Sequence, residues 1–195
     1  MPKIFTKQER EVIQTKLLNA GIAQLEHKSY RNIAVSDIAM EVGIAKGTFY
    51  NFFPSKEVFF YEIMQFIKER NRHNLKNLIR CNPPSKAEVT ECLYQRYTQI
   101  KTVYDYFTPE EMKLIMRKLP NGAVENDSVA FAELICGHLT DMDTKKAKVI
   151  VNMCNILALS AAHRSMFEQE AYEQTVHVFC KAMTDYIFEG EKNKS

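Results

Sequence analysis

The sequence contains little glycine and little proline, only six of each in 195 residues. An all-β chain needs a turn every ~8–12 residues and therefore more of both, so this fold class is excluded. No apolar run approaches the ~18 residues of a membrane-spanning helix. The first ten residues carry four charges and no apolar stretch, which predicts no secretory signal and no membrane contact.

Cysteine is sparse and irregularly placed. The five cysteines are odd in number and never form a C-x-x-C pair; they are Cys81, Cys92, Cys136, Cys154 and Cys180. This pattern is typical of neither a disulfide framework nor a zinc ribbon, and it indicates reduced thiols in the cytoplasm.

Enzyme signatures are missing as well. The sequence has no H-E-x-x-H, G-x-S-x-G, P-loop or dinucleotide-binding pattern. Asp141 and Asp143 lack the glycine and distal glutamate of a calcium loop. Cys136 and His138 are two residues apart, on different faces of a helix, and do not form a metal pair. We therefore expect no catalytic residue, no metal ion and no cofactor.

The composition, with 46% hydrophobic and 26% charged residues, is that of one or two folded domains. The charge is unevenly distributed: residues 1–80 carry 13 Lys and Arg against 8 Asp and Glu, whereas the remainder carries 13 against 16. A basic front on an acidic body suggests that one end meets a polyanion such as nucleic acid. An excess of this size also arises by chance.

Helix signals run through the whole chain. Capping boxes, in which Ser or Thr is followed three residues later by Glu, begin at Thr6, Ser85 and Thr108. Paired prolines at 83–84 break the chain, because proline cannot continue a helix. These signals and the apolar spacing predict helices over 6–26, 35–42, 46–52, 56–79, 85–104, 108–119, 124–139, 143–166 and 168–188. With eight or nine helices and no strand, the predicted fold is all-α.

The segment from Tyr30 to Glu57 has the pattern of two short helices that cross at a steep angle. Five apolar residues would converge on a small core: Ile38, Val42, Ile44, Phe49 and Phe52. The small Ala39 allows a close crossing, and Gly43 is expected to turn the chain with a positive φ. This is the arrangement of a helix-turn-helix, although any helical hairpin with a glycine turn would share it.

The outer face of the second helix of this pair is suited to DNA. Lys46 and the unhindered amide of Gly47 suit a phosphate group. Thr48 and Asn51 can reach base edges, and Tyr50 can contact a phosphate or a thymine methyl group.

Lys56 lies in the first turn of the next predicted helix, which Ser55 is expected to cap. A cation there is unfavourable, because the helix dipole already places positive charge at this end. Contact with a phosphate group of a bound partner explains this position of Lys56 better than the alternative, in which the lysine is simply solvated.

This stretch resembles the N-terminal DNA-binding domain of the tetracycline-repressor (TetR) family of bacterial transcription regulators. The ungapped match includes Tyr30, Val35, Asp37, Ile38, Ala39, Gly43, Gly47, Thr48, Tyr50, Phe53, Ser55, Lys56 and Glu57. The sequence departs from the family at Ile33 and Ala34, which replace a threonine pair that caps the second helix and contacts phosphate. Ala45 also lacks the usual hydroxyl, and Ser36 is expected to take part of the missing phosphate contact.

The resemblance implies a DNA-binding domain over 1–55 and a helical regulatory domain over 56–195 that binds a ligand and dimerises. It implies a homodimer with two recognition helices in successive major grooves of a palindromic operator. A small, largely apolar effector would change their separation and release the DNA.

The last two helices form the dimer interface in the family that the sequence resembles. The residues expected there are Ala158, Ala161, Ala162, Ser165, Val176, Phe179 and Met183. Aromatic and methionine side chains between 84 and 139 suit an apolar effector pocket. The residues expected to line it are Tyr94, Tyr97, Tyr104, Phe107, Met112, Met116 and Phe131. For both sets, packing in the core of the same chain is the alternative.

The sequence therefore predicts a cytoplasmic, all-α, dimeric transcription regulator, and specifically a repressor released by a small molecule. One alternative keeps the DNA binding without an effector, or as an activator. The other is a helical protein-interaction adaptor whose helix pair only mimics the motif.

Overall fold

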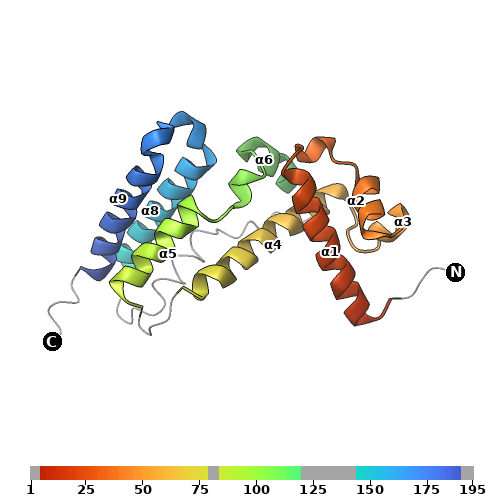
Figure 1. Cartoon of the computed structure of the whole chain (residues 1–195), viewed down its shortest axis with the longest axis horizontal. Coiled ribbons are helices and arrows are strands. Elements are labelled where there is room, and N and C mark those ends of the chain that lie inside the picture. The colour runs from red at the N-terminus through yellow and green to blue at the C-terminus, as the bar shows by residue number, and fades with distance from the viewer. Residues whose placement is uncertain (1–4, 79–83, 120–143, 190–195) are drawn as a thin grey trace. The chain divides into compact units, whose positions relative to one another are not determined.

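The computed structural model describes residues 5–78, 84–119 and 144–189. Within these ranges it contains eight α-helices, three short 3-10 helices and no strand (Figure 1). This confirms the all-α fold. The helix predicted over 124–139, and with it Phe131, lies outside the described residues. None of the described helices combines the length and the apolar character of a membrane-crossing segment.

The described residues form two units. The first contains residues 5–67 and 105–119, and the second contains 68–78, 84–104 and 144–189. The helices are α1 (Lys7–Leu25), η1 (Tyr30–Asn32), α2 (Val35–Val42), α3 (Lys46–Phe49), α4 (Lys56–Lys76), α5 (Lys86–Thr98), η2 (Val103–Asp105), α6 (Pro109–Arg117), α8 (Thr144–Ala162), η3 (Arg164–Met166) and α9 (Gln169–Phe188). α4 begins in the first unit and ends in the second, so the functional division at residue 55 stays a prediction.

The predicted capping boxes are confirmed at the starts of α1, α5 and α6. In α1, the Glu9 amide donates to Thr6 Oγ1 over 3.2 Å, and the Thr6 amide donates to Glu9 Oε2 over 2.8 Å. The helix expected over 46–52 ends at Phe49, and the one expected over 56–79 ends at Lys76. Two further helix ends were predicted wrongly. The helix expected to reach residue 104 ends at Thr98, and the one expected to reach 166 ends at Ala162. Neither end has the glycine or proline that would mark it in the sequence.

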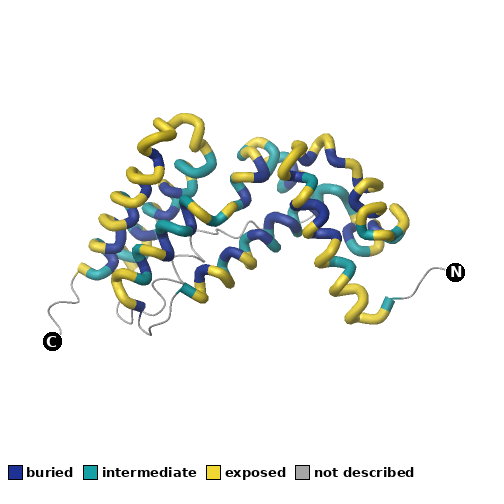
Figure 2. The backbone as a smooth tube through the Cα atoms, in the orientation of Figure 1, coloured by how far each residue is buried: buried dark blue, intermediate teal, exposed yellow. Residues whose placement is uncertain are grey.

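Aromatic side chains fill the core of the first unit, where the buried parts of α1, α2 and α4 meet (Figure 2). The ring of Phe59 packs edge-on against Phe49 at 5.0 Å and against Phe53 at 4.9 Å between centroids. Ile38, on α2, is fully buried as well. Edge-to-face ring pairs add to the stabilisation from burial alone, so these contacts hold the short α3 and the segment after it against α4.

α1 and α4 approach each other closely at Gly21. A Cβ atom at this position would lie 2.5 Å from Ile63 Cδ1 and 2.7 Å from Phe59 Cζ. Such distances are well below van der Waals contact, so only glycine allows this packing.

Helices α5, α8 and α9 lie side by side in the second unit (Figure 1). Their shared core includes Leu93, Ile150, Val176 and Met183. Three free cysteines are buried in it; they are Cys92, Cys154 and Cys180. Burial raises the pKa of Cys92 and of Cys180 to about 12, so these thiols stay protonated at neutral pH.

Candidate nucleic-acid interface

The turn between α2 and α3 has the geometry that the sequence predicts. Gly43 ends α2 in the left-handed region, with φ 77° and ψ 31°, which confirms the expected positive φ. Its amide donates to the Met40 carbonyl over 3.0 Å, and the Ile44 amide donates to the Ala39 carbonyl over 2.9 Å. These bonds satisfy the last carbonyls of α2 and direct the chain into α3.

Only the inner side of α3 contributes to the core. Phe49 and Ile38 are fully buried, whereas Val42, Ile44 and Phe52 are half-buried. All five apolar residues predicted for this core are therefore at least half-buried, and Phe49 is the most buried residue of α3.

The outer side of α3 brings together the residues predicted to bind DNA. Lys46, Gly47, Tyr50 and Asn51 are exposed, and Thr48 is half-buried. They lie within six consecutive residues, in α3 and in the two residues after it, next to the buried Phe49. The surface therefore offers an ammonium, a backbone amide, a phenol hydroxyl and a carboxamide.

Gly47 has no structural reason to be glycine. Its φ is not positive, and a Cβ atom added there would meet no atom within 4 Å. Glycine lowers helix stability by about 1 kcal/mol relative to alanine. A glycine in an exposed helix is therefore best explained by a partner whose surface must come close to the backbone.

The start of α2 has no side-chain cap, because Ala34 occupies the N-cap position. Ser36 was predicted to make part of the phosphate contact that Ala34 cannot make. Its hydroxyl is exposed and donates to Asp37 Oδ1 over 3.3 Å. α3 also starts without a side-chain cap, at Ala45. The phosphate contact of Ser36 stays a prediction.

Lys56 already has an acceptor within the chain. Its Nζ donates to the Arg31 carbonyl over 3.0 Å and lies 5.7 Å from the ring centre of Tyr30 and 5.8 Å from that of Phe60. Burial against these groups lowers the pKa of Lys56. An ammonium has three N–H donors, so the bond to Arg31 leaves donors for the predicted phosphate. Ser55 caps α4 as expected, because its Oγ accepts from the Val58 amide over 3.1 Å.

Sequence reasoning missed two polar links between α6 and the helix-turn-helix. Lys118 Nζ donates to Glu57 Oε1 over 2.6 Å, and the Ser29 hydroxyl donates to Glu111 Oε1. The bond from Lys118 holds the pKa of Glu57 below its usual range. Each pair is more than 60 residues apart in sequence, and no local pattern marks either.

Arg10 was also missed. Its Nη2 donates to the Asn51 carbonyl over 3.1 Å, and its guanidinium lies over the Phe52 ring at 4.6 Å from the centre. Arg10 therefore contacts the segment directly after α3. One basic residue among several in α1 gives no sequence signal for this contact.

The residues predicted for an effector pocket are divided between the two units. Phe107 is buried in the first unit beside Phe60, and Met112 and Met116 are half-buried on α6. In the second unit, Tyr97 is buried and its hydroxyl donates to the Cys154 carbonyl over 3.3 Å. Tyr94 and Tyr104, also in this unit, are half-buried. A role for these residues in binding an effector stays a prediction.

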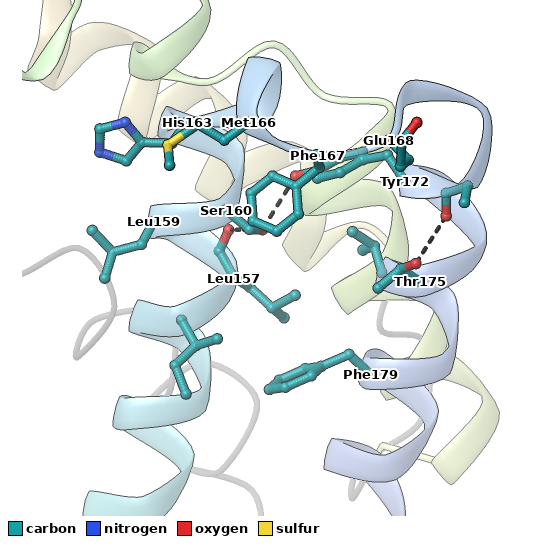
Figure 3. Close-up of a pocket in the computed structure, with 13 residues that line it drawn as sticks. Leu157, Leu159, Ser160, His163, Met166, Phe167, Glu168, Tyr172, Thr175 and Phe179 are labelled. Carbon is teal, nitrogen blue, oxygen red and sulfur yellow. Dashed lines mark hydrogen bonds between the residues drawn. The ribbon is translucent and has the colours of Figure 1, made fainter.

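An open apolar groove lies between α8, η3 and α9, with a volume of about 760 Å³ (Figure 3). Its most exposed apolar side chains are those of Leu159 and Met166, 61% and 80% exposed. The groove is lined by Ile156, Leu157, Leu159, Ser160, His163, Met166, Phe167, Glu168, Ala171, Tyr172, Thr175, Val176 and Phe179. None of the residues predicted for the effector pocket is among them.

Two of the seven residues predicted for a dimer interface line this groove. Val176 and Phe179 line it, and Ser165 is exposed on η3. The others are half-buried Ala158, Ala161 and Ala162 and fully buried Met183. Since Val176 is also buried, the apolar surface open to water comes mainly from residues that were not predicted, such as Leu159.

Comparison with known proteins agrees with the geometry of the N-terminal segment. Residues 17–63 match the family model of the bacterial regulatory proteins of the tetR family. The match covers the end of α1, all of α2 and α3 and the start of α4, and it confirms the resemblance seen in the sequence. The matching model describes the DNA-binding domain of that family. No curated protein matches the chain.

Proposed function

We propose that this chain, a DNA-binding transcription regulator that carries the TetR-family domain, is a homodimeric repressor of a palindromic operator. A small, largely apolar effector releases it from the DNA. The observation that carries the proposal is the exposed surface of α3 and the two residues after it, where Lys46, Gly47, Tyr50 and Asn51 are exposed while Phe49 is buried.

The chemistry of this face fits a DNA major groove. Lys46 provides a cation for a phosphate, which supports affinity for any sequence. The Asn51 carboxamide has the donor and acceptor that pair with the N6 and N7 atoms of adenine. Gly47 adds no side chain between the backbone and the strand. The surface therefore offers both sequence-independent and sequence-reading contacts.

The groove between α8 and α9 supports the dimer. Of the side chains that line it, Ile156, Leu159 and Met166 are more than half exposed, and Phe167 is 43% exposed. Clustered apolar surface of this kind marks an interaction site on a protein surface. A second copy of the chain is the occupant that we propose, because two identical apolar faces related by a two-fold axis cover each other.

The cytoplasm is the compartment we propose for this regulator. The three described cysteines, Cys92, Cys154 and Cys180, are free and buried. Free thiols are typical of proteins in a reducing compartment.

The decisive experiment begins with selection of an operator from random duplex DNA by the full-length protein. The selected duplex is then titrated at several salt concentrations. A DNA-reading dimer should show a steep negative slope of log affinity against log salt and a palindromic consensus. The absence of any enriched sequence, together with a flat slope, would refute the proposal and favour the adaptor.

A thermal-shift screen with small apolar compounds tests the release mechanism. An effector should raise the unfolding temperature of the free protein, because it binds the folded state. The same compound should weaken operator binding, since coupled sites affect each other reciprocally. A regulator without an effector would show neither effect with any compound.

A further inference from the structure

α3 is held in place by few contacts. It contains four residues, its N-cap residue Ala45 provides no side-chain hydrogen bond, and Phe49 is its only buried residue. A helix of this length is unstable by itself, since helix nucleation is costly and short helices depend on tertiary contacts. The orientation of α3 must therefore be fixed by groups outside it.

Arg10 supplies such a contact at the end of α3. Its guanidinium donates to the Asn51 carbonyl over 3.1 Å and covers the ring of Phe52 at 4.6 Å. The ring of Phe5, two residues before α1, lies 6.2 Å from that of Phe52 between centroids. The first turn of α1 thus contacts the turn that follows α3.

The position of Arg10 is itself fixed. The capping box between Thr6 and Glu9 closes the first turn of α1, and the Arg10 amide donates to the Thr6 carbonyl over 2.9 Å. The backbone that carries the guanidinium is therefore part of a regular, capped helix rather than of a loose terminus.

A guanidinium is well suited to this place. Carbonyl groups at the end of a helix carry partial negative charge, which a cation stabilises. A hydrogen bond from a charged donor is stronger than one from a neutral donor. The planar guanidinium can stack on an aromatic ring and donate a hydrogen bond at the same time. A lysine ammonium combines these two contacts less well.

We propose that Arg10 is a positioning residue for sequence recognition by α3. It holds the Asn51 backbone so that the Asn51 side chain meets its base pair in one orientation. This inference rests on the proposed DNA-binding function. It assigns Arg10 to the reading of sequence, not to the general attraction for phosphate.

The test compares R10A with R70A, which removes an exposed arginine from α4. Affinity is measured for the selected operator and for a duplex of random sequence, at several salt concentrations. R10A should lower operator affinity about tenfold while its affinity for random DNA and its salt slope stay equal to those of R70A. R10K should restore part of the lost operator affinity, because lysine keeps the positive charge and can still donate a hydrogen bond.

A phosphate contact would give a different result. Affinity for both duplexes would then fall together, and the salt slope would drop by about one. That outcome would overturn the inference, as would operator affinity equal to that of the R70A control. If R10A does not fold, R10K carries the same comparison.

A double-mutant cycle with N51A tests whether Arg10 acts through Asn51. The N51A variant keeps the backbone carbonyl that accepts from Arg10 but loses the side chain predicted to read a base. In the N51A background, R10A should change discrimination at that base pair less than it does in the wild-type background. Full additivity would contradict the proposed route.

Hydrogen exchange in the protein without DNA separates failure of this inference from failure of the proposed function. R10A should speed amide exchange in residues 46–53 and leave exchange in residues 17–25 of α1 unchanged. Unchanged exchange in 46–53 would overturn the inference even if the wild-type protein binds its operator. Faster exchange would show that Arg10 holds the segment around α3 in place, even if no operator were found.

Discussion

Replacing Gly47 by alanine should weaken the binding of this protein to DNA without lowering its stability. The added methyl group would meet no atom within 4 Å, and the residue does not require a positive φ. A Gly-to-Ala change at such a helical position stabilises a protein by about 0.4–1 kcal/mol, because the unfolded chain loses freedom. The unfolding temperature of G47A should therefore equal or exceed that of the wild type.

Binding should change in the opposite direction. The methyl group would occupy the space through which the backbone of α3 approaches a DNA strand. Loss of one hydrogen bond to a charged group costs about 1.5–3 kcal/mol. With one such loss in each half-site of the proposed dimer, operator affinity should fall by about 100-fold or more.

Gly21 provides the matched control, since the same chemical change there has the reverse consequence. A Cβ atom at Gly21 would lie 2.5 Å from Ile63 Cδ1 in the core. Overpacking of this kind costs about 1–3 kcal/mol, so G21A should melt at a lower temperature. The two variants are compared by thermal unfolding and by operator titration below both melting points. Undiminished operator affinity of G47A, or destabilisation like that of G21A, would refute the role assigned to Gly47.

Three further predictions concern the two surfaces. K46A should weaken binding to all DNA sequences and reduce the salt slope by about one, and unchanged affinity in a gel-shift series would show that the face is assigned wrongly. N51A should relax preference at one base pair per half-site, at a cost of about 1–3 kcal/mol, whereas a uniform loss across operator variants would argue against base reading. L159E should halve the mass measured by light scattering, because it places a charge in the apolar groove. The control H177E changes an exposed residue of α9 outside the groove, and it should leave the mass unchanged. A dimeric L159E would exclude this groove as the interface.

Local patterns were enough to predict where the described helices begin, and to predict the helix-turn-helix. The capping box of Ser85 and Glu88 closes over three residues, and the turn at Gly43 depends on one backbone conformation. Both can be read from adjacent residues. By contrast, the bond between Lys118 and Glu57 joins residues 61 apart, and it forms only because tertiary packing brings α6 to the start of α4.

The spacing of apolar residues in the sequence could not decide which face of α9 packs in the core of its own chain. The sequence shows a stripe that includes Val176 and Met183, and both are buried in the core that α9 shares with α5 and α8. The exposed Val178 is on another side of the helix. A helix with apolar residues on two sides has no sequence feature that says which side meets its own chain. Burial in the folded unit decides it.

The helix-turn-helix is held by its buried side, its turn and the contact with Arg10, and this leaves Lys46 and Gly47 open to experiment. Phe49 is packed among buried rings, Gly43 fixes the turn, and the Arg10 guanidinium holds the carbonyl that follows α3. The side chain of Lys46 and the hydrogen of Gly47 lie on the exposed side and add nothing to this packing. Changes at these two positions should therefore leave the fold intact, so that any loss of operator binding reports on the DNA contact itself.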